Sequence, residues 1–554
     1  MGEPLRSITI VGGGTAGWLA AALLARICKS KDPKHNLEIT LIESPSVPII
    51  GVGEASLPGM VVLLHQLGVS EAEFFKATDA TIKVAARFVN WNHDADGKPV
   101  EFLNILNAPA PIDGRMLADY FVTYHQANGT PEAGRAYARL FSPVVEICDR
   151  NLAPRAVGAP EFSGALGYTY HFDAAKFAGF LKEAATKRGV QHVLDDVDGV
   201  NLDDRGFVRS LQLREGGERG VELVIDCTGF RSTILQQALG EPFQSYGDCL
   251  LNDRAAVVQI PHKDPNVIEP TTRATALSNG WCFNIPLTTR VGTGYVFSSQ
   301  FLSDQEAMDE LLAFYGDQAK GYEPRIIPIR TGRVRNAWVK NCIALGLSGG
   351  FIEPLEATAI FMTDLGVRWL CQYLPSQDFE PALAAAFNRQ ARRVFDEVRD
   401  LVQLHYLLNN REDTPYWKAA REDLKVSDRL AANLEAWAYA TPQPFDLDTA
   451  FLFSSDVYAL VLIAKGFYKD KKLTKAPYLD PAAYERFRNA MRQQRPQQLA
   501  GLADHAAFLK GIGDARPAPF AFAQSHVRGP QGRGPAGTQF ALPGRPPAGH
   551  KPKG

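Results

Sequence analysis

The chain has 554 residues, of which 45% are hydrophobic, so it is long enough to bury a large core in two or three domains. Its 59 Lys and Arg residues nearly balance its 61 Asp and Glu residues, which leaves a formal net charge of −2 at pH 7. This balance provides no basic surface for nucleic acid or for an anionic membrane, so we expect neither as a partner. The seven cysteines form no CxxC pair, which favours a reducing, cytoplasmic location.

Residues 6–43 have the pattern of a nucleotide-binding βαβ unit. An apolar strand is followed by the glycine turn GGGTAG, a helix rich in alanine and leucine, and a second strand, LEITLIE. Because glycines interrupt the first apolar run and no small-residue cleavage site follows it, we expect neither a signal peptide nor a transmembrane helix.

The glycine turn contains the motif GxGxxG, formed by Gly12, Gly14 and Gly17. At the junction of a strand and a helix, such glycines let backbone N–H groups approach a pyrophosphate. Glu43 ends the second strand, where a carboxylate can hold a ribose hydroxyl. The unit therefore predicts a dinucleotide site, with a purely structural glycine turn as the alternative, and the motif alone does not distinguish FAD from NAD.

Two further segments predict sheet structure. Residues 80–91 alternate in the manner of a strand, which puts Ala86 and Phe88 on one face and Lys83 on the other. Residues near 245–300 have the pattern of strands in an antiparallel sheet, inserted where it would cover a substrate.

The C-terminal part predicts helices and then a tail. A strand and glycine turn at 341–351 lead into a helix that Pro354 starts. Helical periodicity dominates from Asp378 to about Leu509. The composition of residues 525–554, rich in Gly, Pro and basic residues, predicts disorder.

Several segments decide between the two dinucleotides. GVGEASLP (51–58), VIDCTGFRS (224–232) and CIALGLSGGFIEP (342–354) resemble the flavin-contacting segments of FAD monooxygenases. The resemblance is most specific to the flavin-dependent tryptophan halogenases, also called tryptophan 7-halogenase-like proteins. In the same order along the chain, that family has segments that resemble IGVGEASLP, ATIKVAARFVNW, HFDAAKF, DCTGFRS, GWCFNIPL, GTGYVFSS and GFIEPLEAT. The resemblance extends from about residue 6 to about residue 470.

The resemblance implies an α/β fold: an FAD-binding, Rossmann-like domain of the flavoprotein monooxygenase (GR2) type, an inserted antiparallel substrate-covering sheet and a C-terminal helical domain. We expect residues 1–375 to form the FAD-binding domain with the inserted sheet, and residues 376–510 to form the helical domain on the substrate side. The tail at 525–554 lies beyond both. The sequence does not determine the oligomeric state, and it does not exclude a homodimer.

The resemblance also implies FAD as cofactor, supplied as FADH2 by a separate flavin reductase that binds transiently. Chloride or bromide is the implied co-substrate, and a small aromatic compound is the implied substrate. The positions that match cofactor-binding positions of the family are Gly12, Gly14, Thr15, Ala16, Gly17, Glu43, Glu54, Ala55, Val197, Leu347 and Ile360.

Lys83 and Glu356 match the catalytic pair of the family. The lysine is implied to activate hypohalous acid (HOX), because an ammonium or amine in an apolar pocket can donate a hydrogen bond to HOX or form a haloamine. The glutamate is implied to face the lysine and to assist removal of the ring proton. The alternatives are a surface lysine on a strand edge and a carboxylate that complements a helix dipole. Thr358 and Ala359 match the halide-binding positions, at the start of a helix.

Three departures from the family bear on the activity. The family's WxWxIP box, implied to shield the flavin, has Phe283 in place of its second tryptophan; its matching residues are Trp281, Phe283, Ile285 and Pro286. The family's EPLEST is EPLEAT here, and the glycine that follows it is Ala359. No histidine in GKPVEFLNILNAP matches the one that holds the indole in tryptophan halogenases, so free tryptophan is not the expected substrate. Tyr458 either stacks on the substrate or packs in the core.

The sequence therefore predicts a two-component flavin-dependent halogenase acting on an indole-like or other electron-rich aromatic compound. A flavin-dependent aromatic hydroxylase is the first alternative, favoured if Phe283 and the altered EPLEAT segment open the flavin to the substrate. A non-catalytic FAD-binding protein is the second alternative. Product formation from reduced flavin, halide and an aromatic compound distinguishes the three.

Overall fold

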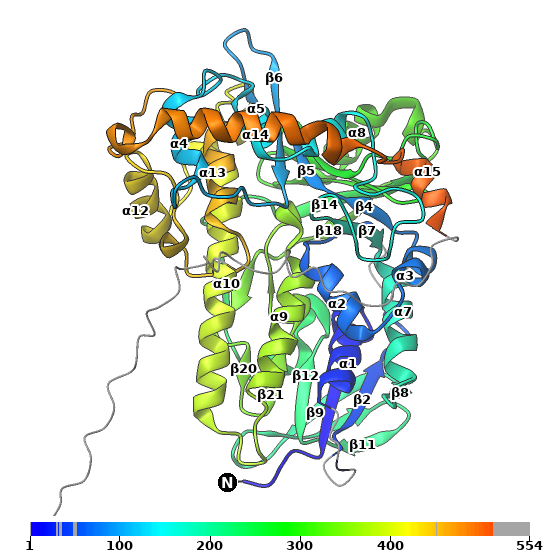
Figure 1. The fold of residues 1–554 in the computed structure, drawn as a ribbon. Helices are drawn as coiled ribbons and strands as arrows, with labels where there is room; N and C mark the ends of the chain where they lie inside the picture. Colours follow the sequence, from blue (N-terminus) through cyan, green and yellow to red (C-terminus); the bar gives the residue numbers. More distant parts are fainter. Residues whose placement is uncertain (1, 29–31, 33–35, 48–52, 450, 513–554) are drawn as a thin grey trace, which may run out of the picture. The chain divides into compact units, whose positions relative to one another are not determined.

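The computed structural model describes residues 2–28, 32, 36–47, 53–449 and 451–512 (Figure 1). The chain divides into two units, residues 1–518 and 519–554, and the description concerns the first. The tail at 525–554, for which the sequence predicts disorder, lies outside the described residues, as do the first two residues of the segment GVGEASLP.

A six-stranded sheet forms the nucleotide-binding core, and it contains the predicted βαβ unit. Its strands, in spatial order, are β20 (Trp338–Val339), β21 (Cys342–Ala344), β12 (Leu223–Asp226), β1 (Ser7–Val11), β2 (Glu38–Glu43) and β8 (Gln191–Leu194). All pairs are parallel except β20 with β21. The central strands are almost wholly buried, as expected for parallel strands covered on both faces. Helices α1 (Thr15–Ile27), α7 (Ala174–Thr186) and α9 (Ala359–Gln372) pack beside this sheet, with α1 in contact with both others.

A seven-stranded mixed sheet lies above the first in Figure 1. Its strands, in spatial order, are β18 (Arg325–Pro328), β14 (Arg254–Ile260), β17 (Val291–Phe297), β16 (Gly280–Pro286), β15 (Thr271–Ala276), β5 (Ala85–His93) and β6 (Pro99–Ile105). The antiparallel sheet predicted near 245–300 is therefore only part of it, and β15 pairs with β5 in parallel. Local sequence patterns indicate strands but do not reveal which distant strands they pair with.

Three small sheets contain the remaining strands of the described chain. They are formed by β3 (Gly53–Ala55), β7 (Thr169–Asp173) and β4 (Thr81–Lys83); by β9 (Val197–Leu202), β10 (Val208–Leu213) and β11 (Gly217–Gly220); and by β13 (Phe243–Ser245), β19 (Gly332–Val334) and β22 (Gly350–Phe351).

The prediction of one continuous strand over residues 80–91 is wrong. The chain leaves β4 at Val84, whose N–H bonds to Pro270 O instead of a strand partner, and then enters the seven-stranded sheet as β5. The break resets the alternation of side chains, so Lys83 and Phe88 need not lie on opposite faces.

The remaining helices gather largely around the seven-stranded sheet. They are α2 (Gly59–Leu67), α3 (Glu71–Thr78), α4 (Leu117–Tyr124), α5 (Ala133–Phe141), α6 (Val144–Asp149), α8 (Asp304–Tyr315), α10 (Pro381–Leu407), α11 (Pro415–Glu422), α12 (Asp428–Trp437), α13 (Ser455–Ala464), α14 (Pro481–Leu499) and α15 (His505–Lys510). The long helix α10 runs from β20 toward the helices α12 and α13 (Figure 1). Its last turn carries His405 and Tyr406 into the protein interior.

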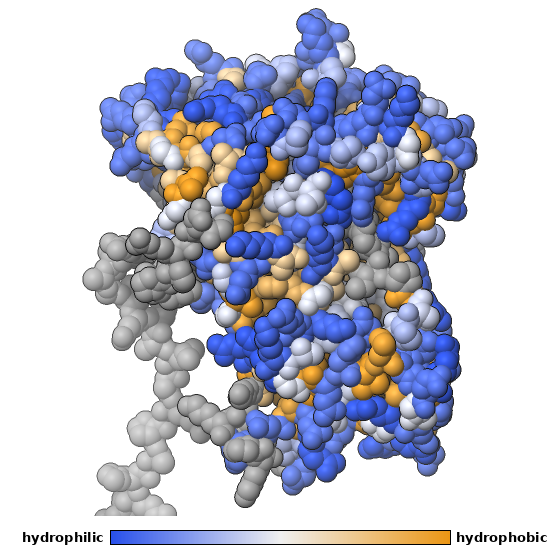
Figure 2. All heavy atoms as spheres, turned by 90° about the vertical axis from the view of Figure 1, so that its right-hand side faces the viewer, coloured by the Kyte–Doolittle hydropathy of each residue, from blue (hydrophilic) through white to orange (hydrophobic). Residues whose placement is uncertain are grey.

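Hydrophilic side chains cover most of the face drawn in Figure 2, with apolar residues in scattered patches. Within the part of the chain that the structure describes, no helix combines the length and apolarity needed to cross a bilayer.

Candidate active site

A cavity of about 500 Å³ lies at the carboxyl ends of β1, β2 and β12, the place where parallel α/β sheets bind ligands. It extends from there to the underside of the seven-stranded sheet. The predicted site residues that line it are Gly12, Gly14, Thr15, Ala16, Glu43, Glu54, Ala55, Lys83, Val197, Trp281, Phe283, Ile285, Leu347, Glu356, Thr358, Ala359 and Ile360. Gly17 and Pro286 lie outside its lining.

The nucleotide end of the cavity is shaped by close backbone packing. Gly12 has φ +120°, and a Cβ there would lie 2.2 Å from Cys227 O, so only glycine fits. A Cβ on Gly17 would lie 1.9 Å from Gly12 O, so glycine at this position lets α1 approach the turn closely. Gly17 therefore serves the packing of the turn and is not part of the cavity lining. The motif thus holds the start of α1 at the edge of the cavity.

The start of α1 has the features of an anion site. Gly14 is its N-cap, has no side chain to cap the helix, and has open space where a Cβ would stand. The first turn contains no acidic residue, so the positive end of the helix dipole is not neutralised by its own side chains. These free N–H groups fit the pyrophosphate of a dinucleotide.

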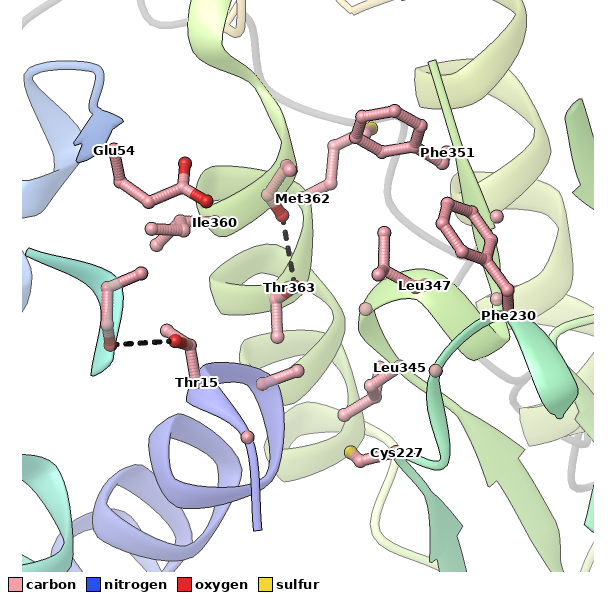
Figure 3. Close-up of a pocket in the computed structure, with 18 of the residues that line it drawn as sticks. Thr15, Glu54, Cys227, Phe230, Leu345, Leu347, Phe351, Ile360, Met362 and Thr363 are labelled. Atoms are coloured by element: carbon pink, nitrogen blue, oxygen red, sulfur yellow. Dashed lines mark hydrogen bonds between the residues drawn. The ribbon is translucent and has the colours of Figure 1, made fainter. Parts of the chain in front are cut away.

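Two carboxyl groups line the cavity beside this helix. Glu43 ends β2, and its Oε2 lies 2.8 Å from His192 Nε2. Glu43 lines the cavity at the place where a ribose hydroxyl would lie. Glu54, on β3, extends toward Ile360 of α9 in Figure 3. Burial raises the pKa of Glu54 to about 7, so much of it is uncharged at neutral pH and can donate a hydrogen bond.

Lys83 reaches the cavity from the end of β4. Its side chain is 3% exposed, which excludes the alternative of a surface lysine, and its Nζ donates to Ser56 O (3.1 Å). Burial lowers the pKa of Lys83 to about 8, against an opposing effect of Glu356. The lysine is therefore still mostly an ammonium at neutral pH. Because the strand breaks at Val84, Phe88 lines the same cavity, contrary to the predicted alternation.

Glu356 lies in a tight turn before α9 and not within a helix. The prediction that Pro354 starts the helix is wrong: residues Leu355–Ala357 form a 3-10 turn, and α9 begins at Ala359. Glu356 and Ala357 have φ values of 68° and 55°, the left-handed region that an α-helix of L-residues cannot include. Such backbone costs on the order of 1–3 kcal/mol per residue and is often found at functional sites. Glu356 therefore lies before the first turn of α9 and not within it.

Two residues that sequence reasoning missed hold the Glu356 carboxylate. Asn104 Nδ2 donates to both of its oxygens (2.7 and 2.9 Å), and His405 Nε2 lies 2.9 Å from Oε1. Burial lowers the pKa of His405, so it is a neutral ring that donates Nε2–H, and it stacks on Phe88 at 4.5 Å. Asn104 and His405 come from β6 and α10, and no local pattern links them to Glu356.

A third missed residue, Glu353, anchors the wall formed by the segment GWCFNIP. Its buried Oε2 accepts from Trp281 Nε1 (3.1 Å), Asn252 Nδ2 (3.1 Å) and Tyr406 Oη (2.5 Å). Trp281, together with Phe283 and Ile285, faces the cavity. Pro286 lies outside the lining; its carbonyl instead accepts from the Thr81 hydroxyl (2.6 Å).

The start of α9 is, after that of α1, a second helix N-terminus at the cavity whose first turn contains no acidic residue. Thr358 is the N-cap, but its side chain makes no capping bond, and its buried Oγ1 has no partner among the described residues.

Tyr458 is 2% exposed, packs against Trp437 at 5.6 Å and is not part of the cavity lining. It belongs to the core.

Comparisons with known proteins agree on one family. The model of the tryptophan halogenase family matches residues 7–478. Tryptophan 6-halogenase from Streptomyces toxytricini is 35% identical over 506 residues, 88% of this chain and 94% of that protein. Among solved structures, a tryptophan halogenase from Shewanella frigidimarina has a TM-score of 0.86 at 32% identity, covering 93% of this chain and 99% of that one. A flavin-dependent halogenase from Brevundimonas has a TM-score of 0.79 at 33% identity, covering 92% and 99%.

Proposed function

The chain belongs to the tryptophan halogenase family and is a flavin-dependent halogenase, and we propose that it halogenates an indole-like or other electron-rich aromatic compound through Lys83 and Glu356. The observation that carries this proposal is the position of these two side chains. Both line the same cavity whose other end has the features of a dinucleotide site.

The residues at the nucleotide end fit FAD. The start of α1 would hold the pyrophosphate, Glu43 a ribose, and Glu54, Leu347 and Ile360 the neighbourhood of the ring system (Figure 3). Reduced FAD, delivered by a separate flavin reductase, supplies the electrons that activate O₂ and yield hypohalous acid from chloride or bromide. The free N–H groups at the start of α9, beside Thr358 and Ala359, suit the halide.

Lys83 and Glu356 would then divide the proton transfers of aromatic halogenation. The net reaction is ArH + HOX → ArX + H₂O, in which the ring carbon takes the halogen and loses its proton. The Lys83 ammonium hydrogen-bonds the HOX oxygen and gives the departing hydroxide a proton, which forms water. The Glu356 carboxylate accepts the ring proton. Asn104 and His405 hold that carboxylate in place.

The surroundings of Glu356 also bear on the substrate. Asn104 binds Glu356 with its amide N–H groups, and its buried Oδ1 has no partner among the described residues. Asn104 lies outside the cavity lining, so this oxygen is not assigned to a substrate contact. The absence of the family's indole-binding histidine favours an indole or phenol other than free tryptophan. The seven free thiols also fit the cytoplasmic location expected from the sequence.

A product screen tests the proposal. Purified protein is supplied with FAD, a flavin reductase, NADH and bromide or chloride, and products from indole, tryptophan and simple phenols are measured by mass spectrometry. We expect a halogenated product whose rate falls by about 100-fold or more in Lys83→Ala.

Lys465→Met is the matched control for loss of a buried amine. Lys465 is a second buried lysine, with its pKa lowered to about 7 by burial, but it lies over Trp91 and Phe102 outside the cavity lining. This variant should keep most of the rate. Halogenation that persists in Lys83→Ala would contradict the role of Lys83, and hydroxylated products in its place would favour the hydroxylase.

A further inference from the structure

Two cysteines meet at the ends of α1 and α9 that point away from the cavity. Cys28, directly after α1, and Cys371, in the last turn of α9, have their Sγ atoms 3.6 Å apart. Both are partly exposed. Cys148, Cys249, Cys282 and Cys342 are buried by contrast.

The two helices have the same relation to the cavity. Thr15 at the start of α1 and Ala359 at the start of α9 both line it, and the two helices are in contact with each other. With 13 and 14 residues, each places its cysteine about 20 Å from the start of its helix at 1.5 Å rise per residue. The thiol pair thus joins the outer ends of the two helices whose inner ends face the site.

Reactivity differs between this pair and the other thiols. The hydrogen bond between Cys28 and Cys371 lowers the pKa of Cys28. Burial raises the pKa of Cys148 and Cys227 well above the usual value, which keeps them as unreactive thiols. The lowered pKa and the partial exposure of Cys28 favour it as the attacking thiol, with Cys371, whose Sγ is 3.6 Å away, as the resolving partner.

We propose that Cys28 and Cys371 form a reversible disulfide that fastens α1 to α9, with hydrogen peroxide as the oxidant. The Cys28 sulfur attacks one peroxide oxygen, which breaks the O–O bond and leaves a sulfenic acid and water. The Cys371 sulfur then attacks the Cys28 sulfur and expels the second water. In sum, two thiols and H₂O₂ give one disulfide and two H₂O: the sulfurs lose two electrons and the peroxide oxygens gain them. A dithiol reverses the step.

The bond requires only a small movement. The Sγ atoms must approach by about 1.5 Å, from 3.6 Å to the normal S–S length. Because the crosslink connects residues far apart in sequence, it restricts the unfolded chain strongly and should stabilise the fold. In a reducing compartment such a bond is transient, which suits a response to oxidant and not a permanent structural link. The inference is independent of the proposed function, because neither Cys28 nor Cys371 belongs to the cavity lining.

The test uses the full-length protein with FAD bound, treated with graded hydrogen peroxide, digested without reduction and mapped by mass spectrometry. We expect a Cys28–Cys371 peptide pair, two hydrogens lighter than the thiols, which disappears after dithiothreitol. The Tm of the oxidised protein should rise by a few degrees. Cys28→Ser and Cys371→Ser should each abolish both effects.

Cys249→Ser is the control for loss of a cysteine that contacts no other sulfur, and it should leave the crosslink and the Tm rise intact. Cys28 found only as sulfenic or sulfinic acid, with Cys371 unmodified, would overturn the proposal. So would two free thiols at a peroxide concentration that oxidises other cysteines of the same sample. A crosslink without any rise in Tm would overturn the claim that it fastens the two helices.

Discussion

The two ends of the cavity are built in different ways. At the nucleotide end, backbone groups do most of the work: Gly12, Gly14 and the start of α1 lie within a few consecutive residues. At the reaction end, side chains meet from separate elements, with Lys83 from β4, Glu356 from a turn and His405 from α10. The first kind of site depends on close backbone packing at Gly12 and Gly17 and needs few specific side chains, whereas the second depends on particular functional groups. Substitutions should therefore separate cofactor binding from turnover.

The largest expected effect is at Glu356. In Glu356→Gln the amide cannot accept the ring proton, so we expect the rate of halogenation to fall by about 100-fold or more. The dissociation constant for FAD, measured by fluorescence titration, should stay within a factor of about two, because an unchanged turn keeps the cavity shape. Glu43→Gln is the matched control at the nucleotide end, where FAD affinity should weaken while the rate at saturating FAD is kept. If both variants changed both quantities, the two ends would not be separable.

A moderate effect is expected at the glycine turn. In Gly14→Ala the new methyl group meets no protein atom within 4 Å, so the FAD-free protein should keep its Tm. The methyl would stand beside the helix N–H groups, and we expect the FAD dissociation constant to rise about tenfold, as for a loss of roughly 1.4 kcal/mol. In Gly17→Ala the methyl would lie 1.9 Å from Gly12 O, so this variant should lower the Tm of the FAD-free protein. Equal behaviour of the two variants would contradict the assignment of Gly14 to the ligand.

The same contrast explains which features the sequence could predict. The glycine turn and Glu43 were found because strand, turn and helix are consecutive, and local periodicity reports on consecutive residues. Lys83 and Glu356 were found only through resemblance to a family, and the structure brings both to one cavity.

Their local geometry was predicted wrongly in both cases. Val84 bonds to Pro270, and Glu356 is left-handed; both follow from tertiary contacts that a periodic pattern does not record. Asn104 and His405 could not be found at all, since each contacts Glu356 from a distant segment. The mixed seven-stranded sheet was recognised only in its middle strands for the same reason.

The smallest expected effect is at Glu353, which connects the wall of the cavity to α10. In Glu353→Leu the Trp281 N–H, the Asn252 amide and the Tyr406 hydroxyl lose their shared acceptor inside the protein, where unpaired polar groups are costly. The indole is then free to shift, and we expect the ratio of halogenated to hydroxylated product to fall about threefold, a change on the order of 0.7 kcal/mol between two barriers. Glu353→Gln keeps one oxygen acceptor and should restore most of the ratio. A lowered ratio in Leu but not in Gln would show that the hydrogen bond to Trp281 holds the wall, whereas an unchanged ratio in both would mean that packing alone is sufficient.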